Sequence, residues 1–464
     1  MGDARRVWAK SHGFSQEMLT DYRRGLEWIL GDPRFTAPGF TPPAAVQVAF
    51  KILAMMEAEL IKAMAQGPSY EPRLDLTASL ALSQVREFFP PEWVQFMERM
   101  GMPPTQLTDE LVASWEPILE KGLVLRNGDV LSNHPWTLSD PVWALLLPSY
   151  IALMLDPTIK PPFGTTPAWI KIEDAQSLSL ALCGDWACPP FAEVGGLCCA
   201  PDRVMEQIGK LGADYTVHLG DVYPLGSRQF YGAFLERWQP GRRGAFTVCS
   251  NHDMYGHAAG YFLDAMMHPM FAAQQGTSYF AVEFGDWIIV GLDSAYHDMS
   301  PLFVKGMIRD PDQRAFLLRV REQVERTGQK TFLMLHHTVL SEDGTSTTTV
   351  WDDIVGEDAL GRAPDVCYTG HLHAGVVYGP DAATGPATKV RVMGHGALPF
   401  GAPDVLAQNA GPGKPVQHYA HTPFPDTFPA HRGLAMNGFA AVTLGHDGSL
   451  TERFINLDGS DMCT

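Results

Sequence analysis

The sequence predicts an α/β domain over residues 171–464, preceded by an all-helical domain over residues 1–155. Apolar residues recur at helical spacing in the first part, whereas short β-favouring runs alternate with helical runs after residue 175. A proline-rich stretch, residues 156–170, predicts a linker because a residue before proline avoids the helical conformation. With 464 residues, the chain has room for two or three domains of roughly 150 residues each.

The first part is most clearly helical from residue 41 onward. Thr41-Pro42-Pro43 is typical of a helix start, and Gly67-Pro68 of a helix end. Between them, one helical face carries Val46, Phe50, Leu53, Leu60 and Met64. Further helical stretches are expected over residues 93–100, 109–121 and 142–155. No residue pattern in this part indicates chemistry or identifies a protein partner.

Composition excludes some classes of function. The 34 Lys and Arg against 52 Asp and Glu give a formal net charge of −18, which argues against nucleic acid as a partner. The longest apolar run, residues 142–155, is interrupted by Pro148 and falls short of the roughly 20 residues that span a bilayer. The N-terminus has no apolar signal region, and the seven cysteines show no paired spacing. We therefore expect a cytoplasmic protein without a transmembrane segment.

The second part alternates strands and helices. Strands are predicted over residues 178–183, 215–219, 245–249, 287–293, 331–335, 365–369 and 389–393. Helices are predicted over residues 202–211 and 311–326, and a terminal hairpin over residues 439–455. The Pro-, Gly- and His-rich residues 401–432 are expected to form a long loop.

Five of the predicted strands end in residue types that bind metal ions. In chain order, the residues after these strands are Asp185, Asp221, Asn251-His252-Asp253, His336 and His371-Leu372-His373. Because ligands of α/β sheets gather at the carboxyl ends of the strands, these side chains are expected to converge. Carboxylate, amide and imidazole ligands suit divalent or trivalent Mn, Fe, Zn, Co or Ni. One shared carboxylate can bridge two such ions about 3.5–4 Å apart.

The same blocks, in this order, resemble the calcineurin-like metallophosphoesterase superfamily. The family pattern is D-x-H, G-D-x-x-D, G-N-H-D/E, a lone His and G-H-x-H. The corresponding blocks here are Asp185-Trp186-Ala187, Gly220-Asp221-Val222-Tyr223, Ser250-Asn251-His252-Asp253, His336 and Gly370-His371-Leu372-His373. Each block alone is weakly specific, but the ordered series over residues 175–397 is a strong signal. The resemblance implies a four-layer α/β/β/α sandwich.

The resemblance also implies a role for each residue. Asp221 would bridge two metal ions, with Asp185 and His373 on the first ion. The second ion would be bound by Asn251, His336 and His371. His252 would protonate the leaving group, with Asp253 fixing its ring. The residue after His336, His337, would lie behind the ligands or on the surface.

The implied activity is hydrolysis of a small phosphorylated substrate, with a hydroxide held between the two ions attacking phosphorus. The opening Gly184-Asp185-Trp186 is similar to that of purple acid phosphatases and favours a phosphomonoesterase. A phosphodiesterase acting on a small cyclic nucleotide or a phospholipid head group is the alternative. A further alternative is a degenerate scaffold that serves as a binding module.

The sequence departs from the family pattern near the first ion. Ala187 replaces a histidine ligand, and Pro224 stands where purple acid phosphatases have a tyrosine ligand. Tyr223, one residue earlier, either reaches the metal or packs. The second aspartate of the second block is missing, and Ser250 replaces a glycine. Other candidates are expected to be structural or solvated: Asp293, His395, His418, His421 and His431.

Overall fold

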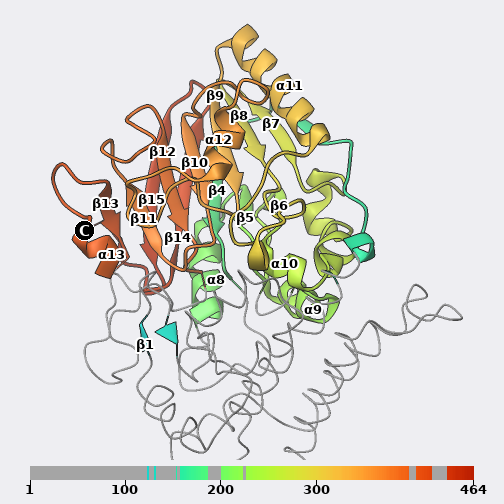
Figure 1. Ribbon diagram of the computed structural model, residues 1–464, viewed down its shortest axis with the longest axis horizontal. Coiled ribbons are helices and arrows are strands. Elements are labelled where there is room, and N and C mark those ends of the chain that lie inside the picture. The colour runs from blue at the N-terminus through green and yellow to red at the C-terminus, as the bar shows by residue number, and fades with distance from the viewer. Residues whose placement is uncertain are drawn as a thin grey trace, which may run out of the picture.

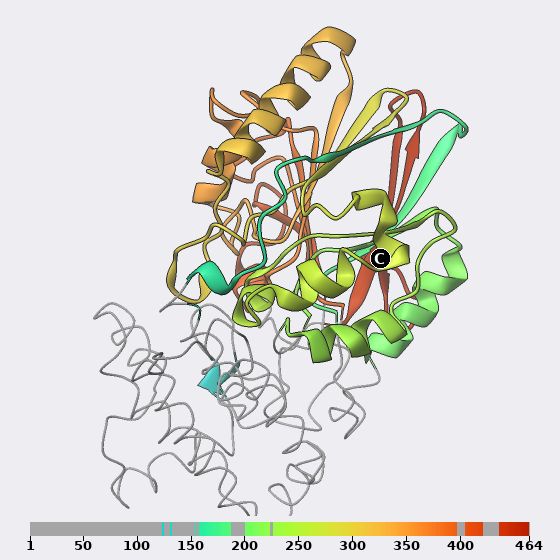
Figure 2. The same ribbon diagram turned by 90° about the vertical axis from the view of Figure 1, so that its right-hand side faces the viewer.

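Two β-sheets lie face to face, and helices cover their outer faces (Figures 1 and 2). The computed structural model describes residues 157–186, 200–222, 226–396, 404–420 and 436–463, with the short pieces 123–124 and 130–131 and residue 153. Within these ranges, no helix has both the length and the apolar character needed to cross a membrane.

The smaller sheet has five strands in the order β15-β14-β4-β5-β6. Their bounds are Ser177–Cys183 for β4, Tyr215–His218 for β5, Gly244–Thr247 for β6, Gly438–Gly445 for β14 and Leu450–Asn456 for β15. Strands β4, β5 and β6 are parallel, so their carboxyl ends share one edge. The predicted terminal hairpin is confirmed as β14 and β15, and β14 also pairs antiparallel with β4.

The larger sheet has eight strands in the order β13-β11-β12-β10-β9-β8-β7-β3. Its parallel centre consists of β8 (Trp287–Gly291), β9 (Lys330–Leu335), β10 (Val366–Thr369) and β12 (Lys389–Met393). The remaining strands are β3 (Ala168–Ile172), β7 (Phe280–Phe284), β11 (Gly375–Tyr378) and β13 (Val416–Tyr419). Strand β13 lies inside the predicted loop, and only Val416 of its four residues is buried, so it has no apolar run to reveal it.

Helices cover both outer faces. Helices α8 (Ala200–Leu211), α9 (Arg228–Arg237) and α10 (Asn251–Tyr255) lie on the side of the five-stranded sheet. Helices α11 (Pro311–Thr327) and α12 (Thr349–Val355) lie on the eight-stranded sheet, as Figure 2 shows for α11. The short α13 spans Asp404–Gln408. Three short turns of 3-10 helix cover Pro157–Ile159, Pro269–Gln274 and Pro301–Phe303, and a π-helix covers Gly260–Ala265.

The bounds of α11 follow from its sequence. Asp310 precedes the helix and accepts hydrogen bonds from the backbone N–H groups of Asp312 and Gln313, and Pro311 occupies the first turn. Gly328 ends the helix at φ 75°, a left-handed conformation that glycine adopts at little cost.

Three apolar cores separate four layers. The core between the two sheets contains Leu180 of β4 and Phe332 of β9. The next residue in each strand points the other way: Ala181 packs in the core of α8 and α9, and Leu333 in that of α11 and α12. Because successive strand residues face opposite sides, β4 and β9 are apolar on both faces. The predicted α/β class is confirmed, and the layers follow the order α/β/β/α.

The predicted linker packs against the sandwich. Strand β3 begins at Ala168, Ile159 is 3% exposed, and the Phe163 ring stacks on Tyr279 with centroids 5.2 Å apart. Residues 157–170 therefore belong structurally to the sandwich, and the proline-rich composition reflects an extended path rather than a free connection. The division into domains stays a prediction.

Most of the predicted helical domain lies outside the described residues. In its described part, Leu123–Val124 and Val130–Leu131 form a short antiparallel pair, so this segment is not helical throughout. Leu153 is helical and packs in the core shared with α8 and α9.

Candidate metal centre

The strand ends of both sheets meet at one place, and the backbone there is unusual. Asp185 after β4, Asp221 after β5 and His371 after β10 have φ values of 54°, 67° and 69°. A left-handed conformation costs a non-glycine residue on the order of 1–3 kcal/mol and persists only where the surroundings enforce it. The backbone is also closely packed here: a Cβ on Gly220 would lie 2.6 Å from His336 Nδ1, and one on Gly370 would lie 2.8 Å from the Leu219 carbonyl oxygen.

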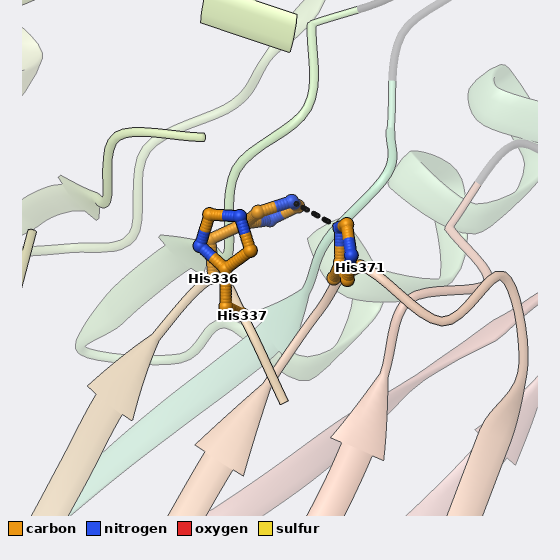
Figure 3. A group of neighbouring side chains, drawn as sticks. All are labelled: His336, His337 and His371. Carbon is orange, nitrogen blue, oxygen red and sulfur yellow. Dashed lines mark hydrogen bonds between the residues drawn. The ribbon is translucent and has the colours of Figure 1, made fainter. Parts of the chain in front are cut away.

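One group of atoms that could bind a metal ion is centred on His336 Nε2. This nitrogen lies 2.8 Å from Asn251 Oδ1, 3.2 Å from His371 Nδ1 and 3.2 Å from Asp221 Oδ1. His371 Nδ1 also lies 3.2 Å from Asn251 Oδ1. Figure 3 shows the rings of His336 and His371 turned toward each other. Residues from both sheets thus place four ligand-type atoms around one point.

Hydrogen bonds on the far side of each ring fix the tautomers. His336 Nδ1 lies 2.8 Å from the Leu219 carbonyl oxygen, and His371 Nε2 lies 3.1 Å from that of Val304. Because a carbonyl oxygen only accepts, each of these nitrogens carries the ring hydrogen and donates it. Burial lowers the pKa of both imidazoles well below the usual value, so both rings are neutral. His336 Nε2 and His371 Nδ1 therefore face each other as bare lone pairs.

The amide of Asn251 is oriented in the same way. Its Nδ2 donates to the Tyr255 hydroxyl at 3.2 Å, and that hydroxyl donates to the Leu302 carbonyl oxygen at 2.8 Å. Asn251 Oδ1 is thereby directed at the two imidazoles. Two nitrogen lone pairs and an amide oxygen then converge with no hydrogen between them, beside Asp221 Oδ1, which accepts the backbone N–H of His252 at 3.4 Å. Such a set repels itself unless a cation lies at its centre, so it fits a metal ion.

A second group is built from carboxylates. Asp185 Oδ1 lies 3.3 Å from His373 Nε2, and Asp185 Oδ2 accepts a hydrogen bond from the backbone N–H of His371 at 3.0 Å. Asp185 and Asp221 are buried against each other. Burial raises the pKa of both carboxyls well above the usual value, and the negative charge of Asp185 raises that of Asp221 further.

The bare oxygens of this second group also fit a cation. Asp185 Oδ1 and Asp221 Oδ2 are buried without a hydrogen-bond donor. Asp185, Asp221 and His373 each offer a ligand atom within 4.8 Å of the others. With Asp221 common to both groups, the described residues contain two neighbouring places that could hold an ion.

His252 lies beside the two groups. Its Nε2 is 3.8 Å from Asp221 Oδ2, its backbone N–H donates to Asp221 Oδ1 at 3.4 Å, and its ring packs edge-on against Tyr255. The side chain is buried, at 4% exposure for the residue. The ring thus approaches the carboxylate that both groups share from outside the cluster of four acceptor atoms.

The carboxylate of Asp253 contacts Ser250 and Tyr231. Its Oδ2 accepts from the backbone N–H and hydroxyl of Ser250 at 2.8 and 2.7 Å, and its Oδ1 accepts from the Tyr231 hydroxyl at 2.7 Å. Ser250 in turn caps α10. This reciprocal capping box fixes the turn that carries Asn251 and His252. Asp253 therefore supports the site through the backbone. Ser250 supplies the hydroxyl of the capping box, which a glycine at this position would lack.

His337 is buried rather than on the surface. Its Nε2 donates to the Phe303 carbonyl oxygen at 2.7 Å, and its Nδ1 lies 2.8 Å from the Ser294 hydroxyl. Its ring packs against His336 and His371, and the three residues form a group close enough to hold an ion (Figure 3). Because protein groups engage both ring nitrogens, His337 is placed to support the ligands rather than to join them.

The other candidates lie in varied surroundings. Asp293 is buried, and its Oδ1 accepts from the backbone N–H groups of Ala295 and Tyr296. His395 lies in the loop after β12, as expected, and is buried there, and burial lowers its pKa to about 3. His418 lies in β13, so the expectation of a loop position is wrong. Five of the positions discussed above for the site fall outside the described residues: Ala187, Tyr223, Pro224, His421 and His431.

Sequence reasoning missed Tyr255, which orients Asn251. The signal was available, because residues four apart on a helix lie on one face and Tyr255 follows Asn251 by four. It also missed the carbonyl groups of Leu302, Phe303 and Val304, which the sequence does not reveal because they are backbone atoms.

No family model and no curated protein matches the sequence. Among solved structures, a purple acid phosphatase from yellow lupin is 15% identical, over 62% of this chain and 53% of its own, with a TM-score of 0.38. A dimetal phosphatase from Danio rerio is 12% identical, over 60% and 96%, with a TM-score of 0.37. GAP50, the anchor in the inner membrane complex of Plasmodium, is 11% identical, over 62% and 88%, with a TM-score of 0.42.

This chain spans about half the length of the lupin protein. The neighbours include phosphatases and a protein described as an anchor, and all three TM-scores are below 0.5. The likeness therefore does not decide the activity, which has to be argued from the site.

Proposed function

We propose that this chain is a metal-dependent phosphoesterase of the calcineurin-like superfamily, with two transition-metal ions and a preference for phosphate monoesters. The observation that carries the proposal is the set of four facing acceptor atoms on Asp221, Asn251, His336 and His371. A site that only stabilised the fold would be expected to pair each of these atoms with a hydrogen-bond donor, whereas the donor seen among the described residues is the His252 backbone N–H, on Asp221 Oδ1. Their convergence with the bare oxygens of the neighbouring carboxylate group supports two ions that share Asp221.

The chemistry of the donor atoms supports the choice of ions. The group around His336 has two imidazole nitrogens and two oxygens, which suits Zn, Fe, Co, Ni or Mn better than Mg or Ca. Asp185 and His373 would complete the neighbouring group, together with Asp221. When bound, two such ions would neutralise charge on the phosphoryl oxygens and acidify the attacking water.

The chain's own residues would then bind, orient and protonate the substrate. Asp221 would fix the position of the two ion sites relative to each other, because it belongs to both. His252 would donate a proton to the departing oxygen, since its ring lies beside Asp221 without belonging to the facing acceptors. Asp253 would keep His252 in place through the capped turn of α10. Positioning and charge would supply most of the rate enhancement, because phosphoryl transfer needs little covalent chemistry from the protein.

Trp186 would act by packing alone. Its side chain is fully buried, its Nε1 donates to the Pro201 carbonyl oxygen at 2.9 Å, and its ring packs against Trp238 and Phe234. It therefore anchors the strand end that carries Asp185 and is not placed to touch substrate. The monoester preference rests on the Gly184-Asp185-Trp186 resemblance and needs a direct test.

The test combines metal analysis with a substrate panel. The purified protein, reconstituted in turn with Mn, Zn, Fe and Co, should hold close to two ions per chain. It should hydrolyse a phosphate monoester faster than the matched diester, such as nitrophenyl phosphate against bis-nitrophenyl phosphate. A faster diester reaction would assign the chain to phosphodiesterases. Two bound ions without turnover of any ester would favour a binding module instead.

A further inference from the structure

Three consecutive backbone carbonyls hold residues of the candidate metal centre. The Leu302 oxygen accepts from the Tyr255 hydroxyl at 2.8 Å, the Phe303 oxygen from His337 Nε2 at 2.7 Å, and the Val304 oxygen from His371 Nε2 at 3.1 Å. These three donors come from α10 and from the ends of β9 and β10. One short segment, residues 298–306, thus reaches three separate elements, and we call it the carbonyl loop.

The carbonyl loop holds a conformation that its sequence does not favour. Leu302 and Phe303 have φ values of 53° and 52°, although neither is glycine. Two successive left-handed residues turn successive carbonyls toward the centre, at a cost on the order of 1–3 kcal/mol for each residue. Something in the loop must therefore keep it from relaxing.

Asp298 closes this loop. Its carboxylate accepts from the backbone N–H of Ser300 at 2.7 Å, from the Ser300 hydroxyl at 2.8 Å and from the backbone N–H of Gly306 at 2.7 Å. The Ser300 hydroxyl also accepts from the backbone N–H of Lys305 at 3.0 Å. Asp298 is 2% exposed, so removing its carboxylate would leave the Gly306 N–H without its acceptor.

We propose that Asp298 is a positioning residue for the metal ion held by Asn251, His336 and His371. By closing the carbonyl loop, it places the Val304 oxygen that sets the tautomer of His371. It likewise places the Leu302 oxygen that, through Tyr255, directs the amide oxygen of Asn251. This inference rests on the proposed metal centre and assigns a further residue to it.

Calorimetric titration of the metal-free full chain with Co²⁺, read together with its visible absorption, tests this proposal. The binding phase that disappears in His336→Ala belongs to the ion held by Asn251, His336 and His371. In Asp298→Ala, the Kd of that phase should rise about 10–100-fold, the usual cost of losing a group that orients a ligand. Its absorption should change, while the Kd of the other ion should stay within about twofold of the wild-type value.

A second variant and a matched control accompany this measurement. Ser300→Ala removes the two hydrogen bonds of the Ser300 hydroxyl but keeps the bond from Gly306 to Asp298, so it should shift the same phase in the same direction by less. Asp458→Ala is the control, because Asp458 makes the same two bonds to Ser460 in an exposed turn closed by Asn456. It should leave both Kd values and the absorption unchanged, even if the melting temperature falls.

The outcomes separate the two proposals. A wild-type chain that binds no Co²⁺ would overturn the metal centre itself. Two bound ions with unchanged Kd and absorption in both Asp298→Ala and Ser300→Ala would overturn the role of Asp298 and leave the metal centre standing. If Asp298→Ala fails to fold, Ser300→Ala alone decides between a shifted and an unshifted phase.

Discussion

The two groups of ligand-type residues share Asp221 but are organised differently. Around His336, the ligand-type side chains other than Asp221 are neutral. Each of them, Asn251, His336 and His371, is oriented by a hydrogen bond on the side away from the group. Around Asp185, two buried carboxyls press against each other and leave two oxygens bare. Hydrogen bonds thus prepare the first of these sites for an ion before the ion arrives. The second is held together against charge repulsion, which a cation or a proton would relieve.

This difference implies different sensitivities. A site built from oriented neutral ligands should respond to changes in geometry, such as those of the carbonyl loop. A site built from carboxylates should respond to charge and to pH.

The largest effect is expected from Asp221→Ala, which removes the residue common to both groups. Elemental analysis should show loss of both ions, and phosphatase activity should fall to background. Asp293→Asn is the matched control. Asp293 is a buried carboxylate after β8 that caps backbone N–H groups, and asparagine retains an acceptor for them. That variant should keep both ions. Two tightly bound ions in Asp221→Ala would refute the shared ligand.

His252→Ala should slow hydrolysis of an alkyl phosphate about 10²–10⁴-fold, the usual contribution of a positioned general acid. A nitrophenyl phosphate should be slowed much less, because nitrophenolate departs without protonation. Steady-state kinetics on the two esters, with metal content measured in parallel, check this. Equal losses on both esters would mean that His252 stabilises the phosphoryl group, and loss of an ion would make it a ligand.

The adjacent histidines 336 and 337 offer a direct comparison of ligand and support. His336→Ala should abolish binding of one ion and retain the other. In His337→Ala the chain should keep both ions, with affinity for the His336 ion lowered by at most about 10–100-fold, because His337 supports the ligands without joining them. Metal titration of both variants measures this. Equal losses would place His337 among the ligands.

The smallest effect is a difference in pH dependence between the two ions. The raised pKa values of Asp185 and Asp221 mean that a cation must displace a proton, so affinity at the carboxylate group should rise with pH. The slope is at most about tenfold per pH unit for each proton displaced. The lowered pKa values of His336 and His371 leave no proton to displace from their rings near neutral pH. Because both ions share Asp221, calorimetry in buffers of different ionisation enthalpy should show the larger proton release for the ion of the carboxylate group. Asp185→Asn should reduce that release, and an unchanged release would contradict this.

The sequence alone determined the α/β class and most strands of the parallel core. For β4, β9 and β12 the predicted and observed ends coincide, because an apolar run ending in Gly, Asp or His marks a buried strand locally. The same local signal identified the residues that the strand ends bring together, Asp185, Asp221, Asn251, His336, His371 and His373.

Tertiary structure decided what each of these residues touches. The sequence could not show that Asp253 takes part in the capping box of α10, or that His337 is buried and packs against His336. It could not reveal the carbonyl loop either, because Leu302, Phe303 and Val304 act through backbone carbonyl groups. The direction of these groups depends on two left-handed residues and on the hydrogen bonds of Asp298, four residues before Leu302. The local sequence pattern shows which side chains stand at the end of a strand. Their contact partners depend on how the two sheets pack. That packing is set by contacts between residues far apart in the chain.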